Sequence, residues 1–333
     1  MTRVAVFGTG SWGTAFAAVL ADTGCRVRMW GRRAELVDQI NQSHINGDYL
    51  PELLLPEAIS ATVDPQEAAD GADIVVLAVP SQMLRANLTH WADFLPHRAA
   101  VVSLMKGVEL GTTKRMSEVI AEVGHVGVER IVVVSGPNLA KEIAAKQPAA
   151  TVVACVDASM AERVAMACAA SYFRPYTNSD VVGTELGGAV KNVIALAVGM
   201  AEGMGMGDNT KSTIITRGLA ETLRLGVALG ADPATFSGLA GVGDLIATCM
   251  SPLSRNHTVG VNLGRGMSVR EVVAMTSQTA EGVKSCQSIL ELARHHGVDV
   301  PIIENVAAVV HEGREPHRVA DRLMSRVRKP ERT

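Results

Sequence analysis

The sequence Gly8-Thr9-Gly10-Ser11-Trp12-Gly13 decides the fold of the N-terminal half. It follows a short apolar run, residues 4–7, and precedes a helix-like run, residues 14–20. In such a unit the first glycine permits a tight turn, the second lets a pyrophosphate approach the backbone, and the third packs the helix onto the sheet. A glycine-rich turn without a ligand is the alternative, but the full Gly-x-Gly-x-x-Gly in this context favours dinucleotide binding. We therefore predict that the cofactor is bound by Gly8, Gly10, Ser11, Trp12 and Gly13.

The end of the second predicted strand indicates which dinucleotide is bound. An NAD site usually carries Asp or Glu there, to hold the ribose 2′-hydroxyl. Here the sequence is Trp30-Gly31-Arg32-Arg33, with two guanidinium groups and no acid. Guanidinium groups suit a 2′-phosphate, so Arg32 and Arg33 favour NADP(H) and leave NAD(H) open as a cofactor. The alternative is that one or both arginines only cap the strand end in solvent.

The chain changes its organisation near residue 180. Before it, short β-branched runs alternate with room for helices, which predicts an α/β Rossmann domain with a doubly wound, mainly parallel sheet. These runs are 4–7, 26–30, 73–79, 100–104, 131–135 and 151–156. Afterwards long helical patterns dominate, at 188–202, 210–229, 281–296 and 301–312. We expect a dinucleotide-binding domain over 1–182, an all-α substrate and catalytic domain over 183–333, and a ligand cleft where they meet.

Composition excludes several classes of protein. The 333 residues have a formal net charge of −3 and only eleven Phe, Tyr and Trp, so nucleic acid is not an expected partner. Five scattered cysteines without a Cys-x-x-Cys pair argue for reduced thiols and against a metal site. The N-terminus has no signal-like apolar core, and charge or Gly interrupts every long apolar stretch before the ~18–20 residues that span a bilayer. We expect a cytoplasmic protein without a membrane span.

Polar residues follow the predicted strands at the sheet edge where ligands bind in doubly wound folds. Lys106 comes directly after the fourth strand, and Ser135-Gly136-Pro137-Asn138 follows the fifth and opens a helix. Lys106 is the expected cation in the cleft. Gly136 and Asn138 are candidate substrate-binding residues.

A lysine interrupts the apolar stretch 187–199 of the helical half. Lys191 and Asn192 are its polar residues. Complete burial would lower the lysine pKa by up to ~3–5 units and let it exchange a proton near neutral pH. The alternative is a lysine that extends its amine to solvent along the helix.

Two further motifs lie downstream. Gly241-Val242-Gly243-Asp244 places an acid in a glycine-rich turn, and Ser254-Arg255-Asn256 groups a hydroxyl, a guanidinium and an amide where a helix could begin. The second motif can bind a phosphate through charge-assisted hydrogen bonds. The alternative is a Ser-Asn helix cap beside a surface arginine.

Together these motifs resemble one family nearly from end to end, the bacterial-type NAD(P)-dependent glycerol-3-phosphate dehydrogenases. The resemblance includes the glycine turn, Tyr49-Leu50-Pro51 with Leu55-Pro56 and Thr62, Lys106-Gly107, Ser135-Gly136-Pro137, Gly188-Ala189-Val190-Lys191-Asn192-Val193-Ile194-Ala195, Thr216-Arg217-Gly218-Leu219-Ala220-Glu221, Gly241-Val242-Gly243-Asp244-Leu245, Ser254-Arg255-Asn256 and Glu281-Gly282. Asn138 departs from it, since the family has a small hydroxyl residue there. Arg217 and Glu221 stand at i,i+4 spacing and are expected to be structural.

The resemblance implies reversible reduction of the triose dihydroxyacetone phosphate to sn-glycerol 3-phosphate, which supplies phospholipid synthesis. It implies that Lys191 is the general acid, and the general base in oxidation. Substrate binding is then expected at Lys106, Gly136, Asn138, Lys191, Asn192, Asp244, Ser254, Arg255 and Asn256. Further cofactor contacts are expected at Lys106, Ala140, Arg255, Thr279 and Glu281, and the family suggests a homodimer.

Two other interpretations stay open. A β-hydroxyacid or 6-phosphogluconate-type dehydrogenase would share the overall plan and a Lys-x-x-Asn helix, but Lys191 is followed directly by Asn192 and has no Asn at 194 or 195. A non-catalytic NADP(H)-binding sensor could retain the glycine turn without turnover. The joint presence of Lys191, Asp244 and Arg255 disfavours the sensor.

Overall fold

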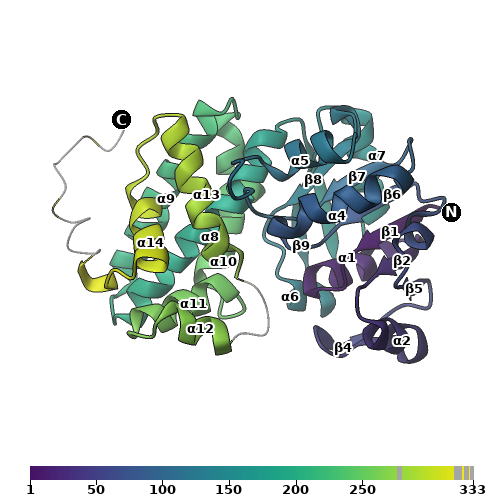
Figure 1. The fold of residues 1–333 in the computed structure, drawn as a ribbon, viewed down its shortest axis with the longest axis horizontal. Coiled ribbons are helices and arrows are strands. Elements are labelled where there is room, and N and C mark those ends of the chain that lie inside the picture. The colour runs from purple at the N-terminus through teal and green to yellow at the C-terminus, as the bar shows by residue number, and fades with distance from the viewer. Residues whose placement is uncertain (276–279, 319–324, 326–329, 331–333) are drawn as a thin grey trace.

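The computed structural model describes residues 1–275, 280–318, 325 and 330, and it has a sheet-containing half and a helical half (Figure 1). The N-terminus lies at the far end of the sheet-containing half, and the described chain ends in the helical half (Figure 1). This arrangement confirms the predicted fold class. The division into domains 1–182 and 183–333 stays a prediction.

The N-terminal half is built on an eight-stranded, mainly parallel sheet. Its β-branched strands are buried on both faces, as expected for a parallel sheet. In spatial order the strands are β10 (Phe173–Asn178), β9 (Ala149–Ala154), β8 (Ile131–Ser135), β7 (Ala100–Ser103), β6 (Ile74–Leu77), β1 (Arg3–Phe7), β2 (Arg26–Trp30) and β5 (Ile59–Thr62). All neighbours pair in parallel except β8 and β9. The strand order reverses at β1, so the predicted ligand edge lies next to the glycine turn.

Helices cover both faces of this sheet. Val4 and Val6 pack on one face with helices α1 (Ser11–Asp22), α2 (Ala34–Ser43), α6 (Ala140–Ala144) and α7 (Ala158–Cys168). Ala5 and Phe7 pack on the other face with α3 (Pro65–Ala69), α4 (Leu84–Trp91) and α5 (Met116–Val123). The alternation of side chains along β1 therefore creates the two cores.

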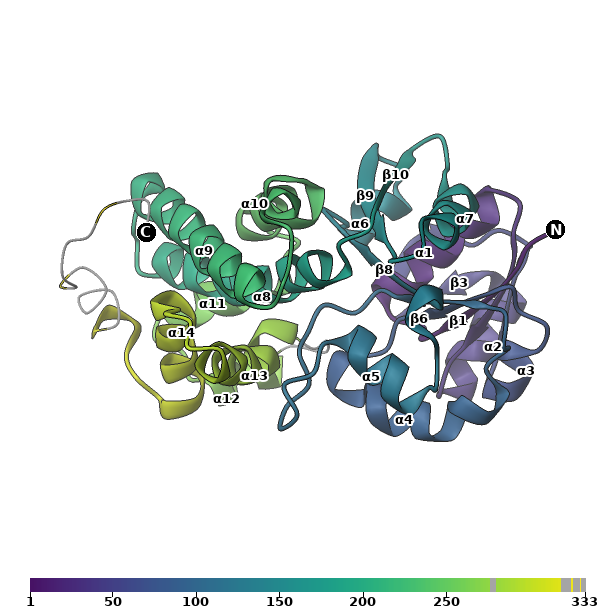
Figure 2. The same ribbon diagram turned by 90° about the horizontal axis from the view of Figure 1, so that it is seen from above.

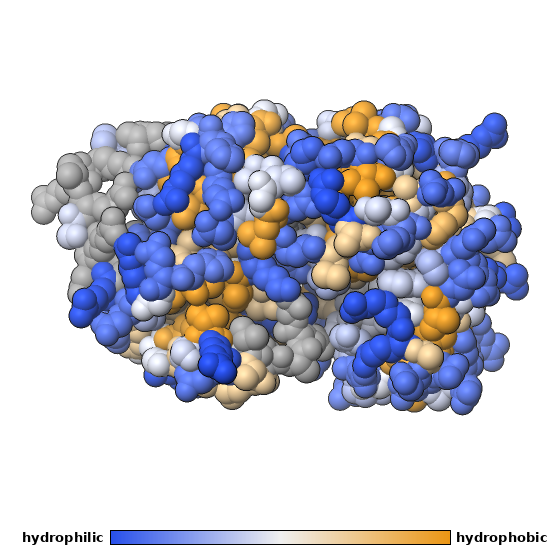
Figure 3. Space-filling view, viewed as in Figure 1, coloured by the Kyte–Doolittle hydropathy of each residue, from blue (hydrophilic) through white to orange (hydrophobic). Residues whose placement is uncertain are grey.

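The helical half is organised around one long helix, α8 (Val181–Gly203) (Figure 2). Around it lie α9 (Asp208–Ala228), α10 (Asp244–Met250), α11 (Arg255–Gly264), α12 (Val269–Met275), α13 (Glu281–His295) and α14 (Pro301–Glu312). Of the described helices, α8 alone is long and apolar enough to span a membrane, but 83% of its apolar window is buried inside the protein. The face seen in Figure 3 is mainly hydrophilic, with apolar side chains in separate patches.

Several element boundaries differ from the sequence expectations. Helix α8 begins at Val181 rather than at 188, because the Asp180 carboxylate accepts a hydrogen bond from the Gly183 N–H (2.8 Å) and caps it. Helices α10, α11 and α12 were not among the predicted helices, although the sequence allowed a helix to begin at Ser254-Arg255-Asn256, where α11 does begin. The edge strands β5 and β10 were not predicted either. The same holds for the antiparallel hairpin of β3 (Ile45–Asn46) and β4 (Leu50–Leu54), whose β3 has only two residues.

Candidate active site

The glycine turn has the backbone geometry that a dinucleotide requires. Gly8 has φ +125°, and a Cβ there would lie 2.6 Å from the Ala78 carbonyl oxygen. A Cβ on Gly13 would lie 2.5 Å from the Gly8 carbonyl oxygen. A Cβ on Gly10 would meet nothing within 4 Å among the described atoms. The first and third glycines therefore permit close packing, and the second leaves its backbone open to a pyrophosphate, so these residues fit the cofactor.

The other predicted residues of this turn start helix α1 or pack beside it. Ser11 is the first residue of α1. The Trp12 ring packs against Phe16 and Phe173, with centroids 5.5 and 6.4 Å apart. Ala140, the first residue of α6, is half-buried against the same core. Their cofactor contacts stay a prediction.

Arg32 and Arg33 are exposed and follow the end of β2, beside the glycine turn. The Gly8 N–H donates to the Trp30 carbonyl (3.0 Å), which joins the two segments. An acid does reach this place, although not from β2: Asp48, in the loop between β3 and β4, pairs with Arg33 at 2.6 Å. The Arg33 guanidinium also lies 5.8 Å from the centroid of the Tyr49 ring. Asp48 could not be predicted from the end of β2, because it comes from a separate hairpin.

Two lysines share one buried carboxylate where the halves meet. Lys191 Nζ donates to Asp244 Oδ1 (2.5 Å), and Lys106 Nζ donates to Asp244 Oδ2 (2.7 Å). The Lys106 ammonium also donates to the Gly136 carbonyl (2.9 Å). The Lys191 side chain is 8% exposed and that of Asp244 is 1% exposed. Lys191 is thus buried with an ion-pair partner and does not extend to solvent.

Three segments bring this cluster together. Lys106 follows β7, Lys191 lies in the middle of α8, and Asp244 begins α10 after a turn of π-helix, η5 (Leu239–Gly243). Close approach of α8 depends on Gly188, where a Cβ would lie 2.6 Å from Ser135 Oγ and 3.3 Å from Lys106 Cγ. A larger residue at 188 would therefore push the Lys191 helix away from Lys106.

The surroundings of Lys191 change its acidity. Burial lowers the pKa of Lys191 to about 8, the nearby Lys106 ammonium also lowers it, and the Asp244 carboxylate opposes the shift. Its amine also donates to Thr248 Oγ1 (2.6 Å). Thr248 lies one helical turn after Asp244 in α10, and this i,i+4 spacing is the sequence signal that could have identified it.

Asn192 and Asn256 link the second half to the Lys106 segment. Asn192 Nδ2 donates to the Lys106 carbonyl (3.3 Å), and Asn256 Nδ2 donates to Asn192 Oδ1 (3.0 Å). The Gly282 N–H at the start of α13 donates to Asn256 Oδ1 (2.9 Å). Asn256 therefore fixes Asn192 and the start of α13.

The Ser254-Arg255-Asn256 motif begins α11. Ser254 is its N-cap and accepts a hydrogen bond from the His257 N–H (3.3 Å), which is the capping role weighed as an alternative. The Arg255 side chain is exposed. The protein around it nevertheless lowers the pKa of Arg255 by desolvation, and the Glu281 carboxylate opposes that shift. Of the three side chains, Arg255 is the one that faces solvent.

Glu281 ties the two halves together. Its carboxylate accepts from Ser81 Oγ (2.6 Å) and from the Ser81 N–H (3.4 Å), and Ser81 follows β6 in the sheet-containing half. The sequence places Ser81 after the third predicted strand, at the ligand edge of the sheet, but Ser81 was not among the predicted site residues. Thr279 lies outside the described residues.

Gly136 and Asn138 lie after β8. Gly136 has φ +147°, which favours glycine, and its carbonyl accepts from Lys106. Asn138 Nδ2 donates to Thr151 Oγ1 of β9 (2.9 Å). Its side chain is therefore bonded to the sheet, and a substrate contact stays a prediction.

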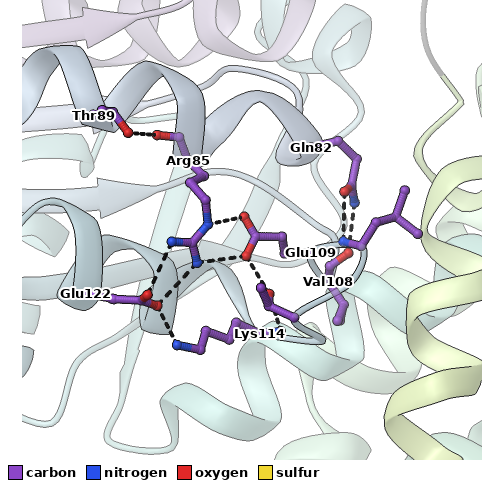
Figure 4. A network of polar contacts seen from close by, with 9 residues as sticks. Gln82, Arg85, Thr89, Val108, Glu109, Lys114 and Glu122 are labelled. Atoms are coloured by element: carbon purple, nitrogen blue, oxygen red, sulfur yellow. Dashed lines mark hydrogen bonds and ion pairs between the residues drawn. The ribbon is translucent and has the colours of Figure 1, made fainter.

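The loop that follows Lys106 is held by a network of polar contacts (Figure 4). Arg85 of α4 forms two contacts of 2.9 Å with the Glu109 carboxylate. Ser288 of α13 donates to the Val108 carbonyl (2.8 Å). The segment that carries Lys106 is therefore fixed to both halves. Within the described chain, no group of three His, Cys, Asp or Glu could hold a metal ion.

The chain is similar to known proteins over nearly its whole length. Residues 3–161 match the model described as NAD-dependent glycerol-3-phosphate dehydrogenase N-terminus, and residues 180–321 match the corresponding C-terminus model. A relative from Streptomyces griseus, named glycerol-3-phosphate dehydrogenase [NAD(P)+], is 66% identical over 99% of this chain and 98% of its own. A relative of the same name from Thermobifida fusca is 61% identical over 100% of this chain and 99% of its own. The crystal structure of glycerol-3-phosphate dehydrogenase from Coxiella burnetii is similar with a TM-score of 0.93 and 34% identity, over 98% of this chain and 99% of that one.

Proposed function

The chain belongs to the NAD-dependent glycerol-3-phosphate dehydrogenase family, and from this premise we propose that it catalyses the reversible reduction of dihydroxyacetone phosphate to sn-glycerol 3-phosphate. Its relatives carry NAD(P)+ in their names, so NADP(H) and NAD(H) both fit as cofactors. The observation that carries the proposal is the buried cluster of Lys191, Asp244 and Lys106 between the two halves.

Lys191 moves the proton of the reaction. When bound, the nicotinamide cofactor supplies the hydride that the ketone carbon receives in reduction. The ketone oxygen then needs one proton, which Lys191 Nζ donates; in oxidation the neutral amine takes the hydroxyl proton back. A pKa of about 8 suits both directions near neutral pH. The Lys191 cation also stabilises the negative charge that grows on the oxygen.

Asp244 holds both amines in place, one on each carboxylate oxygen. With both lysines protonated, the three side chains carry one net positive charge, which attracts an anionic substrate. Arg255 is the exposed cation for the substrate phosphate and for the cofactor, next to Ser254, which caps its helix. Gly136 and Asn192 bond to Lys106, and Asn256 bonds to Asn192. We propose these four residues as further contacts of the substrate. Asn138, bonded to Thr151, is the weakest candidate for substrate binding.

The cofactor side rests on the glycine turn and on Arg32 and Arg33. These exposed arginines favour the 2′-phosphate of NADP(H), while Asp48 partly neutralises Arg33. Ser11, Trp12, Lys106, Ala140 and Glu281 complete the proposed cofactor site.

We further propose a role, a location and an oligomeric state for the whole protein. Its product feeds phospholipid synthesis, the protein works in the cytoplasm, and it forms a homodimer. The sheet-containing domain comprises residues 1–182, and the helical domain comprises 183–333. The abrupt change from strands to helices near α8 supports this division.

The test is loss of NADPH absorbance when purified protein meets dihydroxyacetone phosphate. Parallel assays use NADH and unphosphorylated dihydroxyacetone. We expect turnover that requires the phosphate and is faster with NADPH. Protein that binds NADPH without turning over the substrate would be a sensor or would act on another hydroxyacid.

Replacement of Lys191 tests the proton donor. Lys191→Ala should lower kcat by ~10²–10⁴-fold, because general acid–base catalysis contributes about that much. The dissociation constant for NADPH, measured by fluorescence titration, should stay within about twofold of wild type, since a twofold change is only ~0.4 kcal/mol. Retained turnover in this variant would remove Lys191 from its role.

A further inference from the structure

A buried asparagine outside the predicted site reaches into the glycine turn. Asn46, in β3 of the small hairpin, is fully buried. Its Nδ2 donates to the Thr9 carbonyl oxygen and lies equally close, 2.8 Å, to Thr14 Oγ1. Thr14 belongs to the first turn of α1 and is also fully buried. One side chain from the hairpin therefore bonds to both the turn and the helix that would hold the pyrophosphate.

The chemistry of the partners settles how this amide is oriented. The Thr9 carbonyl oxygen can only accept, so the amide nitrogen of Asn46 must face it. The described chain has no cis peptide bond, and a planar trans peptide points its N–H opposite to its C=O. Because the Thr9 oxygen faces Asn46, the Gly10 N–H points away from the hairpin.

The segment that Asn46 holds has little rigidity of its own. Thr9 stands between Gly8 and Gly10, and glycine backbones rotate more freely than others. The turn is anchored before Thr9 by the bond from Gly8 N–H to Trp30 (3.0 Å) and after it by the bond from Thr14 N–H to Gly10 (2.9 Å). The bond from Asn46 fixes the peptide plane between these anchors.

The two polar atoms of this buried amide differ in their contacts. Asn46 Oδ1 is buried and accepts no hydrogen bond from the described residues. An unsatisfied buried oxygen opposes folding, and an aliphatic side chain would avoid that cost. The contribution of Asn46 to the structure is therefore the pair of bonds that its Nδ2 makes to Thr9 and Thr14.

The same hairpin carries a second link to the cofactor side. Asp48, two residues after Asn46, pairs with Arg33 at 2.6 Å, and the Tyr49 ring lies beside the same guanidinium. The hairpin therefore contacts the glycine turn through Asn46 and contacts Arg33, a proposed binding residue for the 2′-phosphate, through Asp48.

We infer that Asn46 is a positioning residue for the cofactor: it fixes the Thr9–Gly10 peptide so that the Gly10 N–H is presented to the pyrophosphate. This inference rests on the proposed function for the identity of the cofactor. It assigns to the β3–β4 hairpin a part in dinucleotide binding, exerted through the turn.

Direct titration with NADPH, followed by its fluorescence in the absence of substrate, tests the inference. Asn46→Ala should raise the dissociation constant by roughly fivefold to thirtyfold, the effect of losing one or two hydrogen bonds from a fixed site. Thr14→Val keeps the volume and the bond to Thr9 but removes the second partner, and should raise it by about twofold to fivefold. In steady state the KM for NADPH should rise, while the KM for dihydroxyacetone phosphate and kcat at saturating NADPH change by less than about twofold.

Asn41→Ala is the matched control. The Asn41 amide also makes two hydrogen bonds to backbone, to the Ala61 carbonyl (2.9 Å) and from the Ala61 N–H (2.7 Å), but these bonds join α2 to β5 and neither involves the glycine turn. Its loss should lower thermal stability without weakening NADPH binding. Wild-type affinity in Asn46→Ala and Thr14→Val, or equal weakening in Asn41→Ala, overturns the inference. Protein that binds NADPH but does not reduce dihydroxyacetone phosphate would end the proposed function and leave the inference on Asn46 intact.

Discussion

Lys191 owes its properties to three surroundings at once. The apolar faces of α8 bury Lys191, and the Asp244 carboxylate pairs with it. A second ammonium group, that of Lys106, contacts the same carboxylate. Burial and Lys106 disfavour the charged amine, while Asp244 favours it. The balance lowers the pKa of Lys191 from its ordinary 10.5 to about 8, so the group can both give and take a proton near neutral pH.

The two directions of the reaction should respond oppositely to pH. Reduction needs the protonated amine, so kcat/KM for dihydroxyacetone phosphate should fall as pH rises through about 8. Oxidation needs the neutral amine, so kcat/KM for glycerol 3-phosphate should rise through the same range and then level off. Initial rates between pH 6 and 10 in both directions measure this.

Lys191→Arg serves as the control for the pH profile. Its guanidinium stays protonated throughout that pH range, so it cannot accept the proton, and the rise in the oxidation direction should vanish. Identical pH profiles for wild type and Lys191→Arg would contradict the assignment of this pH-dependent rise to Lys191.

At the scale of elements, α8 and α11 approach closely through glycines. Gly199 and Gly203 of α8 face Gly260 and Gly264 of α11, and a Cβ on Gly260 would lie 2.3 Å from the Leu196 carbonyl oxygen. Each pair stands at i,i+4 spacing on one helix face. This contact places the start of α11, with Arg255, relative to Lys191.

Gly260→Ala should therefore force the two helices apart. We expect a loss of ~1–3 kcal/mol in the free energy of unfolding, as for other overpacked sites, measured by denaturant titration. Gly207→Ala is the control, because a Cβ there meets nothing within 4 Å among the described atoms and Gly207 has an ordinary φ of −80°. Equal stability of the two variants would show that the helices adjust without cost.

The start of α14 is capped from α9. The buried Glu221 carboxylate accepts from the Ile302 N–H (2.8 Å) and the Ile303 N–H (3.2 Å). Burial raises the pKa of Glu221 to about 7, although these bonds oppose the shift. The i,i+4 spacing of Arg217 and Glu221 predicted that these residues are structural. It could not show that Glu221 caps a distant helix, α14.

Glu221 should make stability depend on pH. Its folded-state pKa lies above the ordinary 4.5, so the unfolded chain binds fewer protons between pH 4.5 and 7. The contribution of Glu221 is full below about pH 4.5 and is lost as pH rises through about 7. The stability advantage of wild type over Glu221→Gln should shrink by ~2–3 kcal/mol across this window. Denaturant titrations of both proteins at pH 5 and pH 7.5 check it, and a constant difference would contradict it.

At the scale of the whole molecule, a buried ion pair joins the two halves. Glu185 of α8 accepts from Arg115 Nη1 (2.8 Å) and from the Ser117 N–H (2.8 Å) at the start of α5. The Arg115 and Glu185 side chains are 15% and 5% exposed. This pair, the bond between Ser81 and Glu281, and the loop after Lys106 set the relative position of the halves.

Glu185→Ala should destabilise the molecule strongly. It leaves the Ser117 donors without their acceptor and, among the described residues, leaves Arg115 with only the longer pair to Glu118 (3.3 Å), which costs on the order of 3 kcal/mol. Glu304→Ala breaks an exposed pair with Arg294 instead and should cost less than ~1 kcal/mol. Thermal unfolding of both variants compares the two, and similar melting temperatures would count against a structural role for the pair with Arg115.

The sequence determined what depends on local structure. Three glycines at fixed spacing specify the turn after β1, and alternating runs specify the α/β half, because backbone sterics and hydrophobic periodicity act over a few residues. A lysine in an apolar helix made a buried amine one of two interpretations, and the tertiary structure decided for burial. The tertiary structure decided which distant side chains meet. Asp244 lies between Lys106 and Lys191, Asn46 bonds to Thr9 across 37 positions, and Asp48 rather than a β2 residue supplies the acid beside Arg33. Such contacts depend on how helices and strands pack, and the desolvation and charges that set the pKa of Lys191 exist only once that packing has formed.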